Sequence, residues 1–155
     1  MKYFPGRHGE LVKKLRIYID TSVIGGCFDK EFSAESGALF DMARDGKAVL
    51  VISDLLVAEL EDAPKQVADL LRTLPPEAFE RVEVSEEAVR LRDGYISAGV
   101  LGAASENDAL HVALASVNYS DMIVSWNFRH IVHYDKIRGF NAVNLKEGYS
   151  IIAIH

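Results

Sequence analysis

Apolar positions along this chain of 155 residues fall into short runs separated by longer stretches of helical spacing. The short runs are typical of strands because β-branched and aromatic residues are frequent in them; they cover 16–20, 48–53, 80–84, 122–126 and 150–154. The stretches between them predict helices at about 34–46, 54–62, 65–74, 86–99 and 106–119. This alternation predicts an α/β fold with a mainly parallel sheet between two layers of helices.

Local signals mark where several of these helices begin. Ser53, Ser85 and Ser105 are well placed as N-caps, whose hydroxyls can accept a hydrogen bond from the first turn. Pro64 suits the first turn of the helix that follows it. The Gly25-Gly26 pair is typical of a turn.

The length and the composition, 49% hydrophobic and 26% charged, suit one globular domain. We assign residues 16–155 to this domain and residues 1–15 to a basic N-terminal lead. The first 16 residues carry a charge of +4, which leaves −10 for the rest of a chain whose net charge is −6. We interpret the lead as a solvated tail rather than as a nucleic-acid-binding arm.

The chain has no apolar run long enough to cross a bilayer, and its first residues lack the hydrophobic segment of a secretory signal. We therefore expect a cytoplasmic protein without membrane contact. The single cysteine, Cys27, has no partner for an internal disulfide and is given no role. The negative net charge argues against a broad phosphate-binding surface.

Asp20 ends the first predicted strand, in the stretch RIYIDTSVIGG. In open α/β sheets, ligands bind beyond the carboxyl ends of the strands, where loops from several strands converge. An Asx turn or a helix cap would also explain this residue. The choice between these interpretations depends on the other acidic residues.

Two further acids belong to predicted helices. Glu59 lies in SDLLVAELED, beside the apolar face that Leu56 and Leu60 form, although a surface charge would look the same. Asp108 opens the mostly apolar helix SENDALHVALASV, where it can face a shared pocket. Ser105 and Asp108 also match the S-x-x-[DE] capping arrangement, which is a structural alternative.

His111 follows Asp108 by one helical turn. We expect a packed, hydrogen-bonded histidine rather than a metal ligand, because no second histidine follows at ligand spacing. In MIVSWNFRH, the fourth strand ends and Ser125 and Asn127 enter the next turn. A cap or a turn explains Asn127 by itself. Separate strand ends and helix starts nevertheless offer Asp20, Glu59, Asp108 and Asn127, each next to a core segment.

With these residues in this order, the chain from Arg16 to His155 resembles the PIN domain, a family of metal-dependent ribonucleases that includes VapC-type toxins. The matching segments are IDTS, with Asp20 and Ser22, then SDLLVAEL with Glu59, NDALHVALA with Asp108, and SWN with Ser125 and Asn127. In the family pattern, Asp is commoner where this chain has Asn127, and a hydrophobic residue often occupies the position of His130.

The resemblance implies a PIN-like three-layer α/β/α sandwich and cleavage of RNA phosphodiester bonds with Mg²⁺ or Mn²⁺. These hard cations prefer oxygen ligands, and bound metal relieves the repulsion between clustered carboxylates. Asp20 and Asp108 are then the principal metal ligands, and Glu59 is a further ligand, directly or through water. Ser22 would orient Asp20 or a bound water, while Ser125 and Asn127 would complete the outer shell.

The resemblance further implies single-stranded or structured RNA as the substrate, an antitoxin partner across the active-site groove and a homodimer. The main alternative is a degenerate PIN-like module that binds RNA or protein without cutting, which the missing carboxylate at Asn127 supports. A haloacid-dehalogenase phosphatase is disfavoured, because Ser22 stands where that chemistry needs a second Asp. The chain also lacks the GxxxxGK[ST] phosphate loop of an NTPase.

Overall fold

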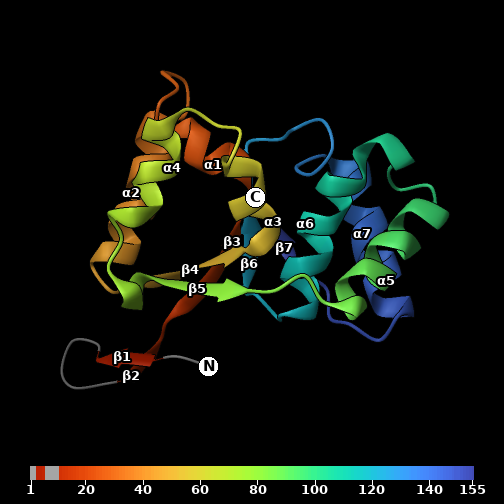
Figure 1. The fold of residues 1–155 in the computed structure, drawn as a ribbon. Coiled ribbons are helices and arrows are strands. Elements are labelled where there is room, and N and C mark those ends of the chain that lie inside the picture. Colours follow the sequence, from red (N-terminus) through yellow and green to blue (C-terminus); the bar gives the residue numbers. More distant parts are fainter. Residues whose placement is uncertain (1–2, 6–10) are drawn as a thin grey trace.

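The computed structural model describes residues 3–5 and 11–155. Its centre is a five-stranded sheet with the strand order β5-β4-β3-β6-β7, in which all neighbouring pairs are parallel (Figure 1). The strands are β3 (Leu15–Ile19), β4 (Ala48–Ser53), β5 (Phe79–Val82), β6 (Met122–Val124) and β7 (Ala153–Ile154). The predicted α/β class and the parallel sheet are confirmed.

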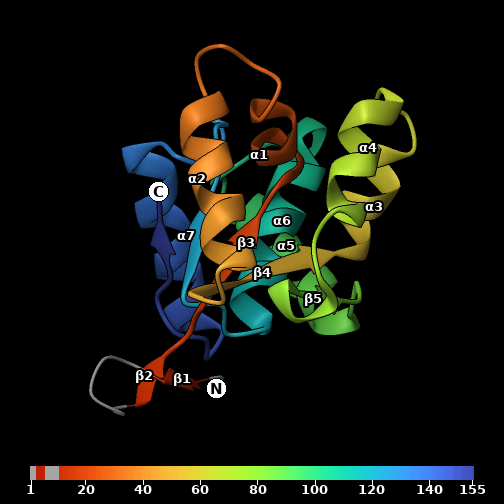
Figure 2. The same ribbon diagram turned by 90° about the vertical axis from the view of Figure 1, so that its left-hand side faces the viewer.

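Helices cover both faces of this sheet, which gives the predicted three layers (Figures 1 and 2). One face carries α1 (Thr21–Gly26), α2 (Ser33–Arg44), α3 (Asp54–Leu60) and α4 (Lys65–Arg72). The other carries α5 (Glu86–Ser97), α6 (Glu106–Val117) and α7 (Tyr134–Lys146). Short 3₁₀ turns, η2 (Pro76–Ala78) and η3 (Ala103–Ser105), precede β5 and α6. None of the helices in the described ranges is long and apolar enough to cross a membrane.

The central strand β3 shows why two cores form. Ile17 and Ile19 pack among α1 to α4, whereas Tyr18 between them packs among α5 to α7. This alternation follows from the two-residue period of a strand. Burying each large apolar side chain contributes roughly 1.5–3 kcal/mol, so both layers hold the strand in one register. The register in turn fixes where Asp20 leaves the sheet.

Two helices, α1 and α7, were missing from the sequence-based prediction. Each contains a glycine whose backbone lies close to a side chain from another part of the chain. The Gly25-Gly26 pair lies inside α1 rather than in a turn, and a Cβ at Gly26 would lie 2.5 Å from Trp126 Nε1. In α7, a Cβ at Gly139 would lie 2.9 Å from Val100 Cγ2. These glycines allow close packing between elements, although glycine lowers local helix propensity.

The predicted caps had different outcomes. Ser53 and Ser85 accept hydrogen bonds from the N–H groups of Leu56 and Ala88, each at 3.2 Å, as expected. Ser105 occupies the N-cap position of α6, as predicted, but its side chain makes no capping hydrogen bond. Pro64 is the residue before α4 rather than part of its first turn.

The predicted basic lead, residues 1–15, overlaps a small antiparallel hairpin. This hairpin consists of β1 (Tyr3–Pro5) and β2 (Leu11–Lys13), and it protrudes from the sheet in both views (Figures 1 and 2). Residues 1–2 and 6–10 of the lead lie outside the described residues. The interpretation of the lead as a solvated tail therefore stays a prediction.

Candidate active site

Asp20 lies directly beyond the carboxyl end of β3, next to the end of β6. Ile19 is paired with Val124 in the sheet, so Asp20 and Ser125 leave neighbouring strands together. Ser125 Oγ donates to Asp20 Oδ2 at 2.8 Å, and Ser22 Oγ donates to Asp20 Oδ1 at 2.6 Å. The structure thus brings Asp20, Ser22 and Ser125 together, with one hydroxyl on each carboxylate oxygen.

The Asp20 carboxylate is only 4% exposed. Burial raises its pKa above the ordinary value, and the charge of Asp108 raises it further. The hydrogen bonds from Ser22 and Ser125 and the charge of His111 lower it in part. Because the net shift is upward, these interactions compensate only in part for the burial of the ionised carboxylate, and a cation beside it would be favourable.

Glu59, on α3, is held by two side chains from other elements. Thr21 Oγ1 donates to Glu59 Oε1 at 3.0 Å, and His111 Nε2 contacts the same oxygen at 2.5 Å. Burial by itself would raise the pKa of Glu59, but the hydrogen bond and charge of His111, together with Thr21, lower it overall. His111 is 2% exposed, which confirms the predicted packed, hydrogen-bonded histidine.

A buried chain of hydrogen bonds continues from His111 away from Glu59. His111 Nδ1 contacts the Tyr18 hydroxyl at 2.6 Å, and this hydroxyl donates to Ser53 Oγ at 2.8 Å. Ser53 is the N-cap of α3, so the chain returns to the helix that carries Glu59. Sequence reasoning missed Tyr18, although a tyrosine inside an otherwise apolar strand needs a partner for its hydroxyl.

Asp108 has a different environment from the predicted cap. His130 Nδ1 contacts Asp108 Oδ2 at 2.8 Å, and both side chains are partly exposed. Asn127 Oδ1 accepts a hydrogen bond from the backbone N–H of His130 at 3.0 Å. Asn127 therefore closes the turn that places His130 against Asp108. The sequence singled out His130 only as a departure from the family pattern.

The side chains around Asp20 have the donor chemistry that Mg²⁺ or Mn²⁺ prefers. Thr21 and His111 both contact Glu59 through Oε1, and His130 contacts Asp108 through Oδ2. One oxygen of each of these two carboxylates therefore makes no hydrogen bond within the described part of the chain. Carboxylate oxygens are suitable ligands for hard cations. Within residues 11–155, however, no group of three or more His, Cys, Asp or Glu side chains is arranged to hold a metal ion. The predicted ligand set of Asp20, Glu59 and Asp108 stays a prediction.

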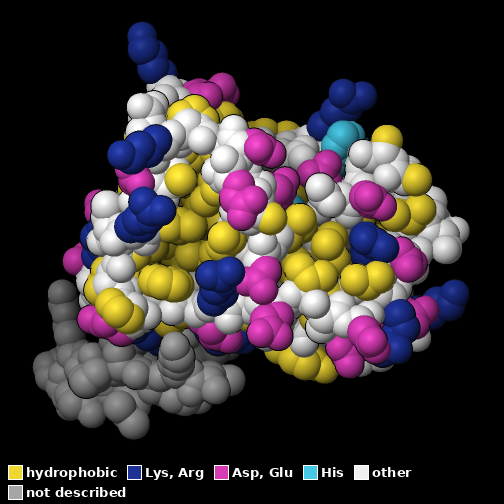
Figure 3. Space-filling view, in the orientation of Figure 1, with side chains coloured by type: hydrophobic (Ala, Val, Ile, Leu, Met, Phe, Trp, Pro, Cys, Tyr) yellow, Lys and Arg dark blue, Asp and Glu magenta, His cyan; other side chains and the backbone are white. Residues whose placement is uncertain are grey.

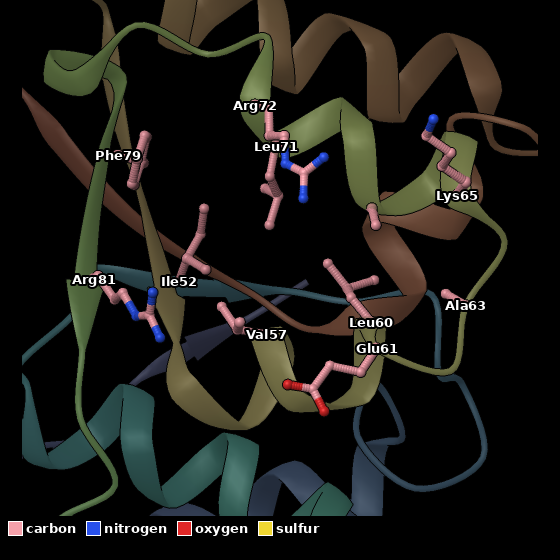
Figure 4. A pocket seen from close by; sticks show the side chains of 11 residues that line it. Ile52, Val57, Leu60, Glu61, Ala63, Lys65, Leu71, Arg72, Phe79 and Arg81 are labelled. Carbon is pink, nitrogen blue, oxygen red and sulfur yellow. The ribbon is translucent and has the colours of Figure 1, made fainter.

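A cavity of about 700 Å³ lies elsewhere, between α3, α4 and β5. Figure 3 shows it as a hollow lined with hydrophobic side chains, and Figure 4 shows Lys65, Arg72, Arg81 and Glu61 around it. Apolar cavities are common ligand sites. A metal-dependent phosphodiesterase needs several carboxylates together, however, and Glu61 is the one acidic residue among those that line this cavity. The carboxyl edge of the sheet is therefore the better candidate for catalysis.

Comparison with solved structures places the fold. The chain is similar to one chain in the crystal structure of VapBC2 from Rickettsia felis, which was solved bound to a DNA fragment from the VapBC2 promoter. The TM-score is 0.54 at 14% sequence identity, and the alignment covers 91% of this chain and 98% of the other. At this identity the likeness shows the fold, which is PIN-like. No protein-family model and no curated protein sequence matches the chain.

Proposed function

We propose that this protein is a divalent-metal-dependent endoribonuclease with its active site at the carboxyl edge of the sheet. The observation that carries this proposal is the buried Asp20 carboxylate, whose pKa is raised by burial and by the charge of Asp108. Such a pair of carboxylates favours a cation between or beside them. Asp20 and Asp108 would be the principal ligands of Mg²⁺ or Mn²⁺, and Glu59 a further one, directly or through water.

When bound, the metal would act as a Lewis acid on the phosphodiester and lower the pKa of the attacking water. The residues of the chain prepare this chemistry by fixing the carboxylates. Ser22 and Ser125 hold the two oxygens of Asp20 in one orientation. His111 and Thr21 hold Glu59 through a single oxygen, which leaves its other oxygen for a ligand or a water.

The experiment that tests this proposal compares Asp20→Asn and Asp108→Asn with Asp45→Asn in an RNA cleavage assay. Asp45 is an exposed acid at the C-cap of α2 and serves as the matched control. Loss of a ligand carboxylate should reduce the cleavage rate by at least about 100-fold, whereas the control should cleave at the wild-type rate. Wild-type cleavage by both site variants, with contaminating nuclease excluded, would refute the assignment.

A second candidate function is supported by Asn127, which has an amide where the family pattern usually has a carboxylate. Its oxygen is engaged by the backbone of His130. A module that binds RNA or protein without cutting fits this observation. Metal binding by calorimetry without cleavage of any strand in a broad RNA panel would favour the non-catalytic module over the nuclease.

We also propose that the protein is a VapC-like toxin with an antitoxin partner and that it works as a cytoplasmic homodimer. The PIN-like fold shared with a chain of VapBC2 supports the toxin proposal. Expression of the wild-type chain should then arrest bacterial growth, while expression of Asp20→Asn at the same level should not. Light scattering on the purified chain tests the homodimer.

A further inference from the structure

Three aromatic side chains form a cluster beside the carboxylates, which we call the aromatic cluster: Phe32, Trp126 and Phe128. The rings of Phe32 and Trp126 are stacked, with centroids 5.1 Å apart and planes 6° apart. The ring of Phe128 packs against that of Phe32, with centroids 6.0 Å apart and planes tilted by 38°. The exposed fraction of Phe128 is 52%, so this ring is open to solvent while Phe32 and Trp126 lie partly buried behind it.

The partly buried end of the aromatic cluster is firmly fixed. Trp126 Nε1 donates to Ser36 Oγ at 2.8 Å, and α1 approaches the indole closely at Gly26. Phe32, between Trp126 and Phe128, directly precedes α2. An exposed aromatic ring with ordered rings behind it loses little conformational entropy when a flat ligand stacks on it.

The aromatic cluster is joined to the candidate active site by hydrogen bonds. The backbone N–H of Trp126 donates to Ser22 Oγ at 2.9 Å, and that of Asn127 donates to Ser125 Oγ at 3.0 Å. Both serine hydroxyls donate to Asp20. Phe128 is the next residue, and Arg129 after it is exposed. The turn therefore offers an aromatic face and a cation beside the carboxylates.

A second exposed aromatic pair shows why this arrangement differs from an ordinary surface. Tyr119 contacts Tyr149 with centroids 6.4 Å apart, and Tyr119 is 62% exposed. That pair lies at the opposite edge of the sheet, where the backbone oxygen of Tyr119 accepts a hydrogen bond from Arg16. Tyrosine can satisfy its hydroxyl in water, whereas phenylalanine gains nothing polar from exposure. Two phenylalanines of the described residues are exposed, Phe28 at 49% and Phe128 at 52%, and Phe128 is the one that packs against the aromatic cluster beside the carboxylates.

We propose that Phe128, supported by Phe32 and Trp126, stacks on an unpaired base of single-stranded RNA whose phosphodiester bond lies at Asp20. This inference rests on the proposed ribonuclease function and adds the residue that would hold a base of the substrate. Bases within a duplex are already stacked on one another, so a stacking residue selects unpaired nucleotides. Arg129 is placed to contact a neighbouring phosphate, which a protein of net charge −6 otherwise attracts poorly.

The test measures RNA binding in the presence of a metal chelator, so that binding is separated from cleavage. The probe is a short unstructured oligoribonucleotide, alone or annealed to its complement, and the affinity is read by fluorescence anisotropy. Trp126 is the single tryptophan of the chain, so quenching of its emission reports events at the aromatic cluster. We compare the wild type with Phe128→Leu, Phe128→Tyr and the control Tyr119→Leu, after circular dichroism has established equal folding.

The wild type should bind the single strand more tightly than the duplex and show quenching of Trp126. Phe128→Leu should weaken binding about tenfold, within the range for loss of one stacked base, because leucine keeps the apolar surface but lacks an aromatic face. Phe128→Tyr and Tyr119→Leu should bind as the wild type does. Arg129→Ala should weaken binding and reduce its salt dependence, which Phe128→Leu should leave unchanged.

Equal single-strand affinity of the wild type and Phe128→Leu would overturn the inference, as would equal wild-type affinity for single strand and duplex. In that case we would interpret the aromatic cluster as a contact surface for a protein partner instead of RNA. Failure of the wild type to cleave RNA with metal present is a separate result. It would count against the proposed nuclease and leave the stacking inference to the binding data.

Discussion

Two carboxylate–histidine pairs near Asp20 are built from the same chemistry but differ in the exposure of the histidine. In one pair, the side chain of Glu59 is 31% exposed, whereas that of its partner His111 is 3% exposed. In the other, Asp108 is paired with His130, and these side chains are 28% and 30% exposed. After their histidines, we call the Glu59–His111 pair the buried side and the Asp108–His130 pair the open side. Each places an imidazole on a carboxylate, at 2.5 and 2.8 Å.

The difference teaches which part of the site is structural and which can meet a ligand. On the buried side, His111 is tied to Tyr18 and through it to Ser53, so the imidazole has a partner on both ring nitrogens. On the open side, His130 belongs to a surface turn that also carries the exposed ring of Phe128. His111 is therefore part of the fixed interior of the site, whereas His130 lies where the proposed RNA substrate would approach.

The largest expected effect on stability comes from removing the histidine of the buried side. His111→Ala should lower the free energy of unfolding by about 3 kcal/mol, because it leaves a cavity and removes a partner from both Tyr18 and Glu59. His130→Ala should cost less than about 1 kcal/mol, since its pair with Asp108 is partly exposed and screened. Urea denaturation of the metal-free proteins measures both values. Equal losses in the two variants would mean that the two sides do not differ as described.

Tyr18→Phe refines that comparison without opening a cavity. Only the hydroxyl is lost, so His111 Nδ1 and Ser53 Oγ each lose one contact. We expect a loss of about 1–2 kcal/mol in the same denaturation experiment. A variant as stable as the wild type would show that the hydrogen-bond chain from Glu59 to Ser53 does not contribute to folding.

Asp20 and Glu59 should show opposite dependence of stability on pH in metal-free protein. The folded-state pKa of Asp20 is raised by burial, so its contribution is fully present below its ordinary value of 3.8 and is lost as pH rises through the folded value. His111 and Thr21 lower the pKa of Glu59 although its burial opposes this. The contribution of Glu59 to the free energy of unfolding is therefore present above its ordinary pKa of 4.5 and is lost as pH falls through the folded-state pKa.

At pH 7, therefore, Asp20→Asn should be more stable than the wild type and Glu59→Gln less stable, each on the order of 1 kcal/mol. The gain for Asp20→Asn should shrink as the pH approaches 4, and the loss for Glu59→Gln should shrink below that. Thermal unfolding across this pH range, with a chelator present, measures both trends. The same sign for both variants at pH 7 would contradict the electrostatic description of the site.

The sequence predicted the sheet and the residues around Asp20 because both depend on strand patterns. Alternation in β3 and β6 places Asp20 and Ser125 at the same edge, and the structure shows them hydrogen-bonded. The contact between His130 and Asp108 was beyond sequence reasoning, because it depends on a turn whose geometry Asn127 sets. For the same reason, the sequence could not exclude the alternative of a cap between Ser105 and Asp108, which the structure does not show: a distant histidine provides Asp108 with a partner.

Long-range contacts also explain the missed helices. The short α1 contains two glycines, and only its packing against Trp126 shows why glycine is needed at position 26. In α7, Gly139 contacts Val100, which precedes it by 39 positions. Neither contact leaves a local pattern in the sequence. Strand periodicity was therefore the most informative signal for predicting the fold, and the turns between elements were the least predictable part.

The smallest expected change in stability sharpens the open side by adding a charge at Asn127. In the structure, Asn127 Oδ1 accepts from the backbone N–H of His130, and an aspartate oxygen can accept the same bond. The free energy of unfolding of Asn127→Asp should therefore lie within about 0.5 kcal/mol of the wild-type value, whereas Asn127→Ala, which lacks the acceptor, should lose about 1 kcal/mol.

The added carboxylate should tighten Mg²⁺ or Mn²⁺ binding and lower the metal concentration needed for RNA cleavage, because hard cations bind more strongly as ligand charge increases. Calorimetric titration with Mn²⁺ beside a cleavage assay checks both effects, with Asn127→Ala as the control for disturbance of the turn. Tighter metal binding with no cleavage by either the wild type or Asn127→Asp would favour the non-catalytic module, and unchanged metal binding would place Asn127 outside the metal site.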